Sequence, residues 1–544
     1  MKLSAVALVA LVACGPKEVP YQVSVITTTC DMAVNPFQGV QYLKVRVTGD
    51  GITTPLEASS VRDARSVAIP AIPAGPKRVV EVRAYDGDPT AGGKLVSIGK
   101  SYPFDVPDVV PPELAGGAYG INVFLRKVGV FSPVVSASNP TQCVRMRTAR
   151  AGHTATLLNN GKVLVAGGYN GAVGSRTALN DVEMFNPLNN TFEVGRPMSI
   201  RNTASDTPFP KAFHTATKLP NGQVVMWGGE LYSVGNGVES TVPVSSVIVY
   251  DEASDRYVPT GRRDEAAQVL PRSRHSAAVD QSGNILIVGG LTRVSAANPP
   301  ADKLEGFIGD TKSADFNKTF AVATASAFIR LDAAVSPIKS GEFIAIAGGA
   351  SGATGTELRT DVSFFKFDAA AKTFNAVALS SVPRLSDPGR RSAGVALLRD
   401  GTEMAMLGGY KHATQVLPAD VPSEILSSAT STVTLGPSVG LRGELCAVTL
   451  PNGSVIAIGG RTTEMVSGVP KTKSDGSSTL VTPSGAGGAI SVPGPSLSTG
   501  RSAHTCTLLA DGSVLVLGGV NEQTNGTVEV LQDAWIYQPA PVDP

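Results

Sequence analysis

The sequence predicts an all-β protein, in which seven copies of one four-stranded unit follow a smaller β domain. The stretch HTATLLNNGKVLVAGG (153–168) returns as HTATKLPNGQVVMWGG (214–229), HSAAVDQSGNILIVGG (275–290) and HTCTLLADGSVLVLGG (504–519). A pair of glycines marks seven units at nearly constant spacing, and helical periodicity is nearly absent. Short strands joined by tight turns are therefore expected along the whole chain.

The first copy shows what one unit contains. Alternating residues from His153 to Leu158 are followed by Asn160-Gly161, which favours a two-residue hairpin turn because both positions need positive φ. The run Val163–Ala166 is apolar and largely β-branched, as in a buried strand. Gly167-Gly168 ends the strand where backbone must pass close to backbone.

The glycine pairs give the number of units. They are spaced 51 to 61 residues apart, and a turn glycine precedes each by six or seven residues. The pairs begin at Gly167, Gly228, Gly289, Gly348, Gly408, Gly459 and Gly518. Repeats of this length predict a seven-bladed β-propeller with one four-stranded sheet per repeat.

Third and fourth strands are clearest early in the chain, at Val182–Pro187 and Thr191–Val194. The same pattern returns at Val247–Asp251 and again at Val362–Asp368. It is degenerate around 300–320, 423–437 and 478–497.

The pattern R-x-x-H-T-A-T-x-L-x-x-G-x-V-L-V-x-G-G, followed by V-E-x-F-N-P, resembles the kelch motif over roughly residues 143–544. This resemblance implies a kelch β-propeller. The last copy ends at Pro544 after a third strand around Trp535. We therefore predict that Cys143–Met146 supplies its fourth strand and closes the ring, which removes an unpaired edge.

Residues 21–130 lack glycine pairs but contain regularly spaced strand signals, among them 42–47, 66–69 and 78–85. They predict a small β-sandwich, immunoglobulin-like in the broad sense. The sequence leaves its role open between a spacer and a carbohydrate-binding module.

The N-terminus predicts export. Lys2 precedes an apolar segment too short to span a bilayer, and Leu11-Val12-Ala13-Cys14 resembles the lipobox of bacterial lipoproteins. We expect a signal peptide over 1–13, a lipid on Cys14, a tether over 14–20 and a place in the outer membrane. The alternative is an ordinary secretory signal with an incidental cysteine.

The charge balance limits the classes of binding partner, and the cysteine content bears on disulfide bonds. Lysine and arginine number 46 against 45 acidic residues, which argues against nucleic acid bound by bulk charge. Export favours disulfides, and Cys30–Cys143 with Cys446–Cys506 is the pairing we favour, with free buried thiols as the alternative.

Four of the five histidines, His153, His214, His275 and His504, occupy one repeated position, where other copies place Ala333, Ala393 or Leu445. A position that accepts these types indicates structure rather than metal binding, so we expect neither metal nor cofactor. Kelch proteins also include copper oxidases, but the Tyr-His dipeptide of that group is missing here.

A basic residue stands three positions before this site in all seven copies. Two interpretations stay open: a structural ion pair or hydrogen bond, or a positive ring at the channel mouth that binds an anion. The residues are Arg150, Lys211, Arg272, Arg330, Arg390, Arg442 and Arg501.

Long segments follow several glycine pairs, at 230–246, 291–312, 350–360, 410–424 and 461–478. Variable loops on a rigid frame commonly form binding surfaces, although they can also be mere variation in length. Candidate binding residues on them are Glu230, Tyr232, Arg293, Tyr410, His412 and Arg461.

These observations favour a lipid-anchored envelope protein that binds a protein or glycan without turnover. A carbohydrate-active enzyme, oxidase-like or epimerase-like, on the same face is the alternative, and a purely structural surface protein is a third. No nucleophile stands beside a base at a recognisable spacing, and no catalytic residue is assigned.

Overall fold

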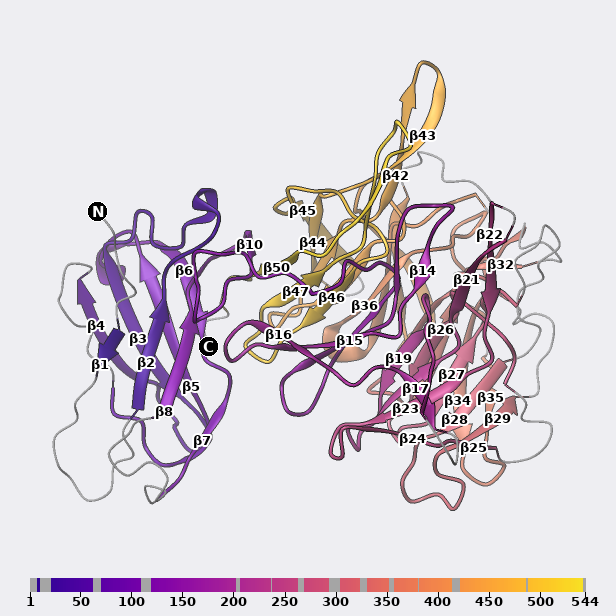
Figure 1. Ribbon diagram of the computed structural model, residues 1–544, viewed down its shortest axis with the longest axis horizontal. Helices are drawn as coiled ribbons and strands as arrows, with labels where there is room; N and C mark the ends of the chain where they lie inside the picture. Colours follow the sequence, from indigo (N-terminus) through magenta and orange to yellow (C-terminus); the bar gives the residue numbers. More distant parts are fainter. Residues whose placement is uncertain are drawn as a thin grey trace.

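A computed structural model describes residues 7–9, 21–61, 70–108, 119–201, 206–235, 237–262, 269–292, 304–322, 330–351, 357–379, 381–412, 421–485 and 488–541. Two lobes are visible in Figure 1, a smaller one formed by the N-terminal strands and a larger one formed by the repeats. No helix in the described part of the chain is long and apolar enough to cross a bilayer.

The smaller lobe consists of two sheets that share one core. β1 (Ala7–Val9), β2 (Tyr21–Ile26) and β8 (Tyr119–Phe124) form one sheet, in which β2 and β8 run parallel. The other has the order β4 (Leu56–Val61), β3 (Tyr42–Thr48), β5 (Gly75–Tyr85), β6 (Leu95–Lys100) and β9 (Arg126–Lys127), with β7 (Phe104–Val106) paired to β5. Alternate residues of β2, β3, β5 and β8 fill the space between the sheets.

Two N-terminal expectations fall largely or wholly outside the described residues. The segment 66–69, where we expected a strand, is outside the described residues, and so are Cys14 and most of the expected signal peptide. β1 lies within that peptide.

In its described residues the larger lobe has seven sheets of four or five strands, one for each glycine pair, and we number them in chain order. Their first strands are β11 (Thr154–Leu157), β19 (Thr215–Lys218), β26 (Ser276–Val279), β30 (Ala334–Ile338), β36 (Gly394–Leu398), β40 (Cys446–Thr449) and β46 (Thr505–Leu508). Each first strand contacts the next, and β46 contacts β11, so the seven sheets form a closed ring.

The second strands lie next in each sheet and have buried side chains throughout, except for Phe343 at the start of β31, which is half-buried. They are β12 (Val163–Ala166), β20 (Val224–Trp227), β27 (Ile285–Val288), β31 (Phe343–Ala347), β37 (Glu403–Leu407), β41 (Val455–Ile458) and β47 (Val514–Leu517). These strands pack between neighbouring sheets, which explains their continuous apolar character.

The third strands are present in every sheet. They are β15 (Val182–Asn186), β23 (Val247–Asp251), β28 (Leu304–Ile308), β34 (Val362–Asp368), β38 (Pro422–Ser427), β44 (Ser478–Ser484) and β50 (Ala534–Tyr537). Three of them, β28, β38 and β44, lie in the segments where the sequence pattern is degenerate. A strand can pair there without the V-E-x-F-N-P motif, because pairing depends on how side chains pack on the sheet rather than on one motif. The expected loops 291–312 and 410–424 were therefore drawn too long, since they include β28 and part of β38.

The fourth strands complete each sheet. They are β16 (Thr191–Val194), β24 (Arg256–Val258), β29 (Lys318–Val322), β35 (Thr373–Ala376), β39 (Thr432–Ser438), β45 (Gly488–Pro493) and β10 (Phe131–Pro133). The third sheet gains a further strand, β25 (Gly261–Arg262), parallel to β29.

The strand that completes the seventh sheet is β10, not the predicted Cys143–Met146. Phe131 pairs with Tyr537 and Pro133 with Trp535. Cys143 makes only an isolated bridge to Val135. β10 forms the fourth strand of the seventh sheet because Phe131 and its neighbours are buried against the core of the sixth and seventh sheets.

The glycine pairs hold neighbouring sheets together. A Cβ on Gly408 would lie 2.3 Å from the carbonyl oxygen of Arg442 in the next sheet. The following Gly409 donates its N–H to that same oxygen at 3.0 Å. Gly518 stands in the same relation to Arg150, at 2.5 Å, across the point where the ring closes. Each junction therefore requires backbone contact that only glycine permits.

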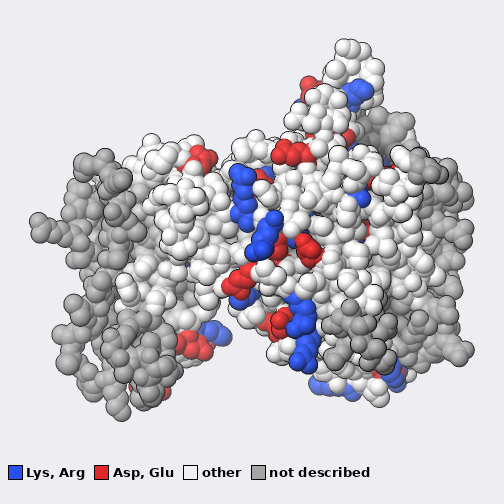
Figure 2. All heavy atoms as spheres, in the orientation of Figure 1, with Lys and Arg blue, Asp and Glu red and all other residues white. Residues whose placement is uncertain are grey.

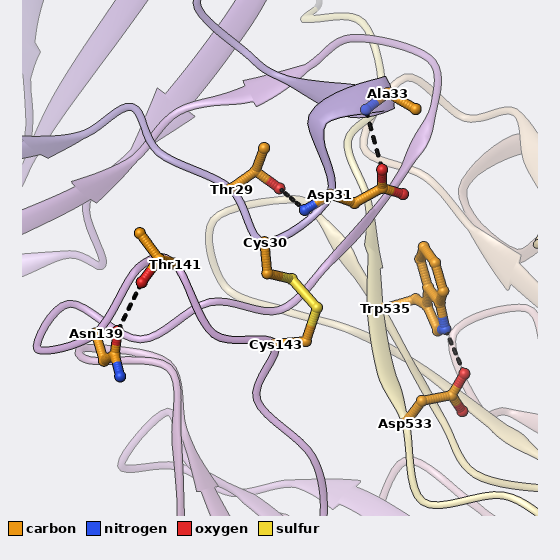
Figure 3. The surroundings of a disulfide bond; sticks show 9 residues. All are labelled: Thr29, Cys30, Asp31, Ala33, Asn139, Thr141, Cys143, Asp533 and Trp535. Carbon is orange, nitrogen blue, oxygen red and sulfur yellow. Dashed lines mark hydrogen bonds between the residues drawn. A yellow bond between two sulfur atoms is a disulfide. The ribbon is translucent and has the colours of Figure 1, made fainter. Parts of the chain in front are cut away.

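Several segments join the two lobes. Cys30 of the smaller lobe forms a disulfide with Cys143, with Cα atoms 5.3 Å apart, and Figure 3 shows it beside the Asp533–Trp535 hydrogen bond of the seventh sheet. Buried Arg126 lies 3.7 Å from Asp511. Since β9 and β10 are only three residues apart in sequence, the chain passes directly from one lobe to the other.

Candidate functional site

The seven basic residues are buried inside the sheets. Their side chains range from 0% to 2% exposed. In five sheets the guanidinium donates to the carbonyl of the first glycine of its own pair, from Arg150 to Gly167 (2.9 Å), Arg272 to Gly289 (2.7 Å), Arg330 to Gly348 (3.1 Å), Arg390 to Gly408 (2.9 Å) and Arg501 to Gly518 (3.1 Å).

The same five arginines form ion pairs with a carboxylate at the third strand. The pairs are Arg150–Glu183 (2.7 Å), Arg272–Glu305 (2.5 Å), Arg330–Asp361, Arg390–Glu424 (2.6 Å) and Arg501–Asp533 (2.9 Å). The acid lies either just before the third strand or two residues further along the chain. Because side chains alternate between the two faces of a strand, both positions point to the same face of the sheet. This placement contradicts the hypothesis of an anion-binding ring, because all seven basic side chains are buried and five of them are already paired with an acid of their own sheet.

Two sheets lack the acid. Lys211 donates to the Ser246 hydroxyl at 3.2 Å, and burial lowers the pKa of Lys211 to about 7. Arg442 instead reaches the hydroxyls of Ser477 at 2.7 Å and Thr479 at 2.9 Å.

A second set of seven residues, two positions after the basic ones, surrounds the channel. All have left-handed backbone conformation, with φ between 50° and 60°, yet only one is glycine. They are Gly152, Phe213, Arg274, Asp332, Ser392, Glu444 and Ala503. We call them the mouth ring. Backbone bonds join neighbours, as from Phe213 N–H to Gly152 at 2.8 Å and from Glu444 N–H to Ser392 at 2.9 Å.

The mouth ring opens on a cavity of about 370 Å³. Besides the ring, Ala333, Ala393, Ser276 and the four repeated histidines line it. The residue preceding each ring member bridges to the residue after a glycine pair, as Ala212 does to Glu230. Among the described residues, five two-stranded hairpins start beside the ring in this way. The side of the ring that carries the hairpins and the mouth is here called the loop face.

The hairpins form the rim of the loop face. They are β13 (Tyr169–Asn170) with β14 (Thr177–Ala178), β21 (Glu230–Gly235) with β22 (Val238–Pro243), β32 (Ala350–Ser351) with β33 (Glu357–Leu358), β42 (Arg461–Val466) with β43 (Val469–Ser474), and β48 (Val520–Glu522) with β49 (Val528–Val530). In Figure 1 the β42–β43 hairpin extends well beyond the body of the larger lobe.

Predicted residues Glu230 and Tyr232 belong to one side of the mouth. Glu230 is 1% exposed and accepts from the Tyr232 hydroxyl at 2.7 Å. Arg274 of the mouth ring donates to Glu230 at 3.1 Å and stacks on Phe213, 3.9 Å from the ring centre. Burial opposes the charge of Arg274, but Glu230 outweighs it and raises the pKa of the guanidinium.

Tyr410, His412 and Arg461 belong to the other side. Arg391 lies 5.1 Å from the ring centre of buried Tyr410 and donates to the carbonyl of His412 at 3.0 Å. Arg461 pairs with Glu522 at 2.6 Å and lies 4.0 Å from Glu444. Arg293 lies outside the described residues.

The four repeated histidines make contacts between sheets. Nε2 of His153, His214 and His275 bonds the hydroxyl of Thr505, Thr154 and Thr215 at 3.0, 3.0 and 2.9 Å. His504 faces the sheet that has Cys446 in place of the threonine, and no hydrogen bond to its Nε2 is found within the described part of the chain. Burial lowers the pKa of all four, that of His504 to about 3.

Cys446 is paired with Cys506, with Cα atoms 6.1 Å apart. This disulfide joins the first strands of the sixth and seventh sheets. The pairing follows from the repeat, because equivalent strands of adjacent sheets lie side by side.

Comparison with known proteins fits this architecture. The family described as "Kelch motif" matches residues 149–199, which span the first repeat. The fold is a kelch-type β-propeller. A fungal alcohol oxidase of the AA5 family, solved in complex with copper, is similar in structure to this chain, with a TM-score of 0.50 at 14% identity, covering 76% of this chain and 77% of that one.

The solved structure of YjhT gives a TM-score of 0.39 at 12% identity, covering 72% of this chain and 96% of that protein. No curated protein sequence matched the chain. Likeness at these identities concerns the fold of the propeller alone.

The propeller's channel residues do not fit a copper site. Three of the histidines use Nε2 for threonine hydroxyls of the neighbouring sheet, which occupies that nitrogen. Within the described ranges, no three His, Cys, Asp or Glu residues are placed to share a metal ion. We therefore derive no step through a metal.

The mouth ring escaped sequence reasoning, although the sequence holds its signal. Between two repeated positions, one basic and one mostly histidine, stands a residue that varies from glycine to phenylalanine, arginine and glutamate. Its variation in an otherwise repeated frame marks the place where the copies differ in chemistry.

Proposed function

We propose that this chain is a lipid-anchored protein of the bacterial cell envelope whose seven-bladed kelch propeller binds a partner, a protein or a glycan, without turnover. An immunoglobulin-like β-sandwich would stand between the propeller and a lipid on Cys14, in the outer membrane. The lipobox-like Leu11–Cys14 segment supports the anchor, and the ring of seven sheets supports the blade number.

One observation carries the binding role. The repeats agree in their buried positions and differ in the mouth ring, which holds Phe213, Arg274, Asp332 and Glu444 at a cavity edged by hairpins. The repeated packing of the sheets does not require these particular side chains, since the ring position holds a different residue type in each repeat. A rigid frame with variable groups at one open end is the usual design of a binding site.

The rim adds apolar contact surface. Val234 and Val238 near the tip of β21–β22 are 54% and 68% exposed, and Met465 on β42–β43 is 57% exposed. These side chains lie on two separate hairpins and offer apolar groups that a partner could cover. By contrast, Figure 2 shows acidic and basic groups intermixed on the visible face, which gives no support to a nucleic-acid partner.

A carbohydrate-active enzyme on the same face remains the second candidate. Asp332 and Glu444 place two carboxylates at one cavity, and paired carboxylates can act as acid and base. An epimerase-like or hydrolytic reaction would fit them better than an oxidase-like one, given the histidine contacts described above. Turnover of a sugar panel, lost in a Glu444→Gln variant, would establish this alternative.

Capture from the native envelope tests the binding role. Detergent-solubilised full chain would be immobilised, cross-linked to envelope extract and compared with a variant whose β21–β22 and β42–β43 hairpins are shortened at their tips. Those hairpins lie outside the seven sheets, so the frame should survive. A control would carry Asp400→Asn in a turn at the opposite end of the channel. A partner lost only from the hairpin variant supports the proposal, and retention of nothing by any folded form contradicts it.

A further inference from the structure

We propose that the mouth of the propeller binds a neutral, hydroxyl-rich ligand, a saccharide, through Glu444, Asp332 and Arg274. This inference rests on the proposed function and names the ligand class of its site. Its basis is the hydrogen-bonding capacity that the described residues leave open at the cavity.

Two carboxylates offer acceptor atoms. The nearest cation to Glu444 is Arg461, whose Nη1 lies 4.0 Å from Oε1, beyond hydrogen-bond length. Asp332 receives both the Ser392 hydroxyl, at 2.9 Å, and Arg391, at 3.4 Å, on Oδ2. Within the described residues Oδ1 of Asp332 has no bond. Both residues line the cavity, which places these acceptors at the proposed site.

Arg274 offers the complementary donors. Its Nε and Nη2 donate to Glu230 at 3.4 and 3.1 Å, and its plane rests on Phe213. The guanidinium is therefore fixed before a ligand arrives. Among the described contacts none uses Nη1, so this edge can donate to an oxygen in the cavity.

His504 differs from the other three histidines at the mouth. Its side chain lines the cavity, and the residue as a whole is only 9% exposed. Its Nε2 lacks the threonine that the other three histidines bond, at least among the residues described.

The charge pattern favours a neutral ligand. A cation would meet Arg274 at the mouth with Arg391 and Arg461 behind it, whereas an anion would meet Asp332 and Glu444. A hydroxyl group both donates and accepts, so it suits carboxylates and guanidinium together. Small residues, Gly152, Ala333, Ala393 and Ala503, leave open space, and about 370 Å³ lies in the range of small-ligand sites.

The test is binding of defined sugars to the full chain. Glucose, galactose, mannose and N-acetylglucosamine would be titrated by calorimetry and by saturation-transfer NMR, beside glucuronate and glucosamine as charged comparators. At least one neutral sugar should saturate. Glu444→Gln and Asp332→Asn should each weaken it tenfold or more, and Ala503→Leu, which narrows the mouth without altering charge, should also abolish it.

Asp400→Asn is the matched control. Asp400 also has a left-handed backbone, with φ of 55°, but lies at the far end of the channel, and its variant should bind within twofold of wild type. The inference is overturned if no neutral sugar saturates, if only the charged sugars bind, or if the mouth variants bind like wild type. If no sugar binds while capture of an envelope partner still depends on the hairpins, the proposed binding role is supported and the saccharide ligand class is wrong.

Discussion

At the scale of single residues, the propeller depends on buried charge that is neutralised locally. Five arginines have a carboxylate partner on or just before the third strand, whereas Lys211 donates to the Ser246 hydroxyl and has no carboxylate partner among the described residues. Asp361 and Asp533 stand at the place of Ser246 in two other sheets. Of the two basic residues without an ion pair, Arg442 has Asp475 near enough to oppose the effect of burial on its pKa, whereas burial alone acts on the pKa of Lys211.

This difference predicts a stabilising substitution. Ser246→Asp should raise the free energy of unfolding by about 1–3 kcal/mol at pH 7, because it gives Lys211 a charged hydrogen-bond partner. In wild type the pKa of Lys211 is about 7 when folded and 10.5 when unfolded, so wild-type stability should rise between those pH values. The advantage of the variant should therefore shrink as the pH approaches 10.

Chemical denaturation at pH 7, 8.5 and 10 measures the difference in the free energy of unfolding between Ser246→Asp and wild type. Ser245→Asp, at the exposed neighbouring position, is the control and should change stability little. A variant that is no more stable than wild type at pH 7 would show that Lys211 is not penalised by burial.

At the scale of elements, the glycine pair is the joint between sheets. Gly408→Ala should cost about 3 kcal/mol or more, because its Cβ would lie 2.3 Å from the backbone oxygen of Arg442 at a φ of 60°. Gly468→Ala in the turn of β42–β43 has a φ of 78° but open space around it, and should cost only about 1–2 kcal/mol. Thermal melts of both variants compare the two; equal losses would mean that conformation, rather than contact between sheets, selects the glycine pair.

At the scale of the whole molecule, the lobes are fixed to each other by the Cys30–Cys143 disulfide, the Arg126–Asp511 pair and β10. The disulfide closes a segment with a sequence separation of 113 residues, so Cys30→Ala with Cys143→Ala should cost about 2–5 kcal/mol. Limited proteolysis should also cleave more readily between residues 128 and 142.

The Cys446→Ala/Cys506→Ala pair is the comparison, because that disulfide lies within the propeller and should leave the 128–142 segment protected. Cleavage that is unchanged in the Cys30/Cys143 variant would indicate that β10 and the ion pair suffice to hold the lobes together.

The repeat made most of the ring predictable. Turn glycines, glycine pairs and buried strands recur in the letters themselves, as from Gly161 to Gly167. Closure by Phe131–Pro133 could not be predicted, because nothing repeated marks that segment and only its burial against the last sheets selects it. The sequence shows the repeated basic residues but not their role. Their acidic partners occupy either of two positions in the repeat, so no single acidic position recurs to reveal the ion pairs. The mouth ring was missed because its residues share a backbone conformation and no side-chain type.

The central claim is that function lies at the loop face, where the copies differ. Photo-cross-linking in native cells tests it most directly, with a photoreactive amino acid placed in the full chain at Ala503 or Val238. Matched positions on the far side would be Asn221 and Asp400. The account predicts a discrete adduct from the loop-face positions and none from the far side. Adducts that form only from Asn221 or Asp400, or from none of the four positions in folded protein, would contradict it.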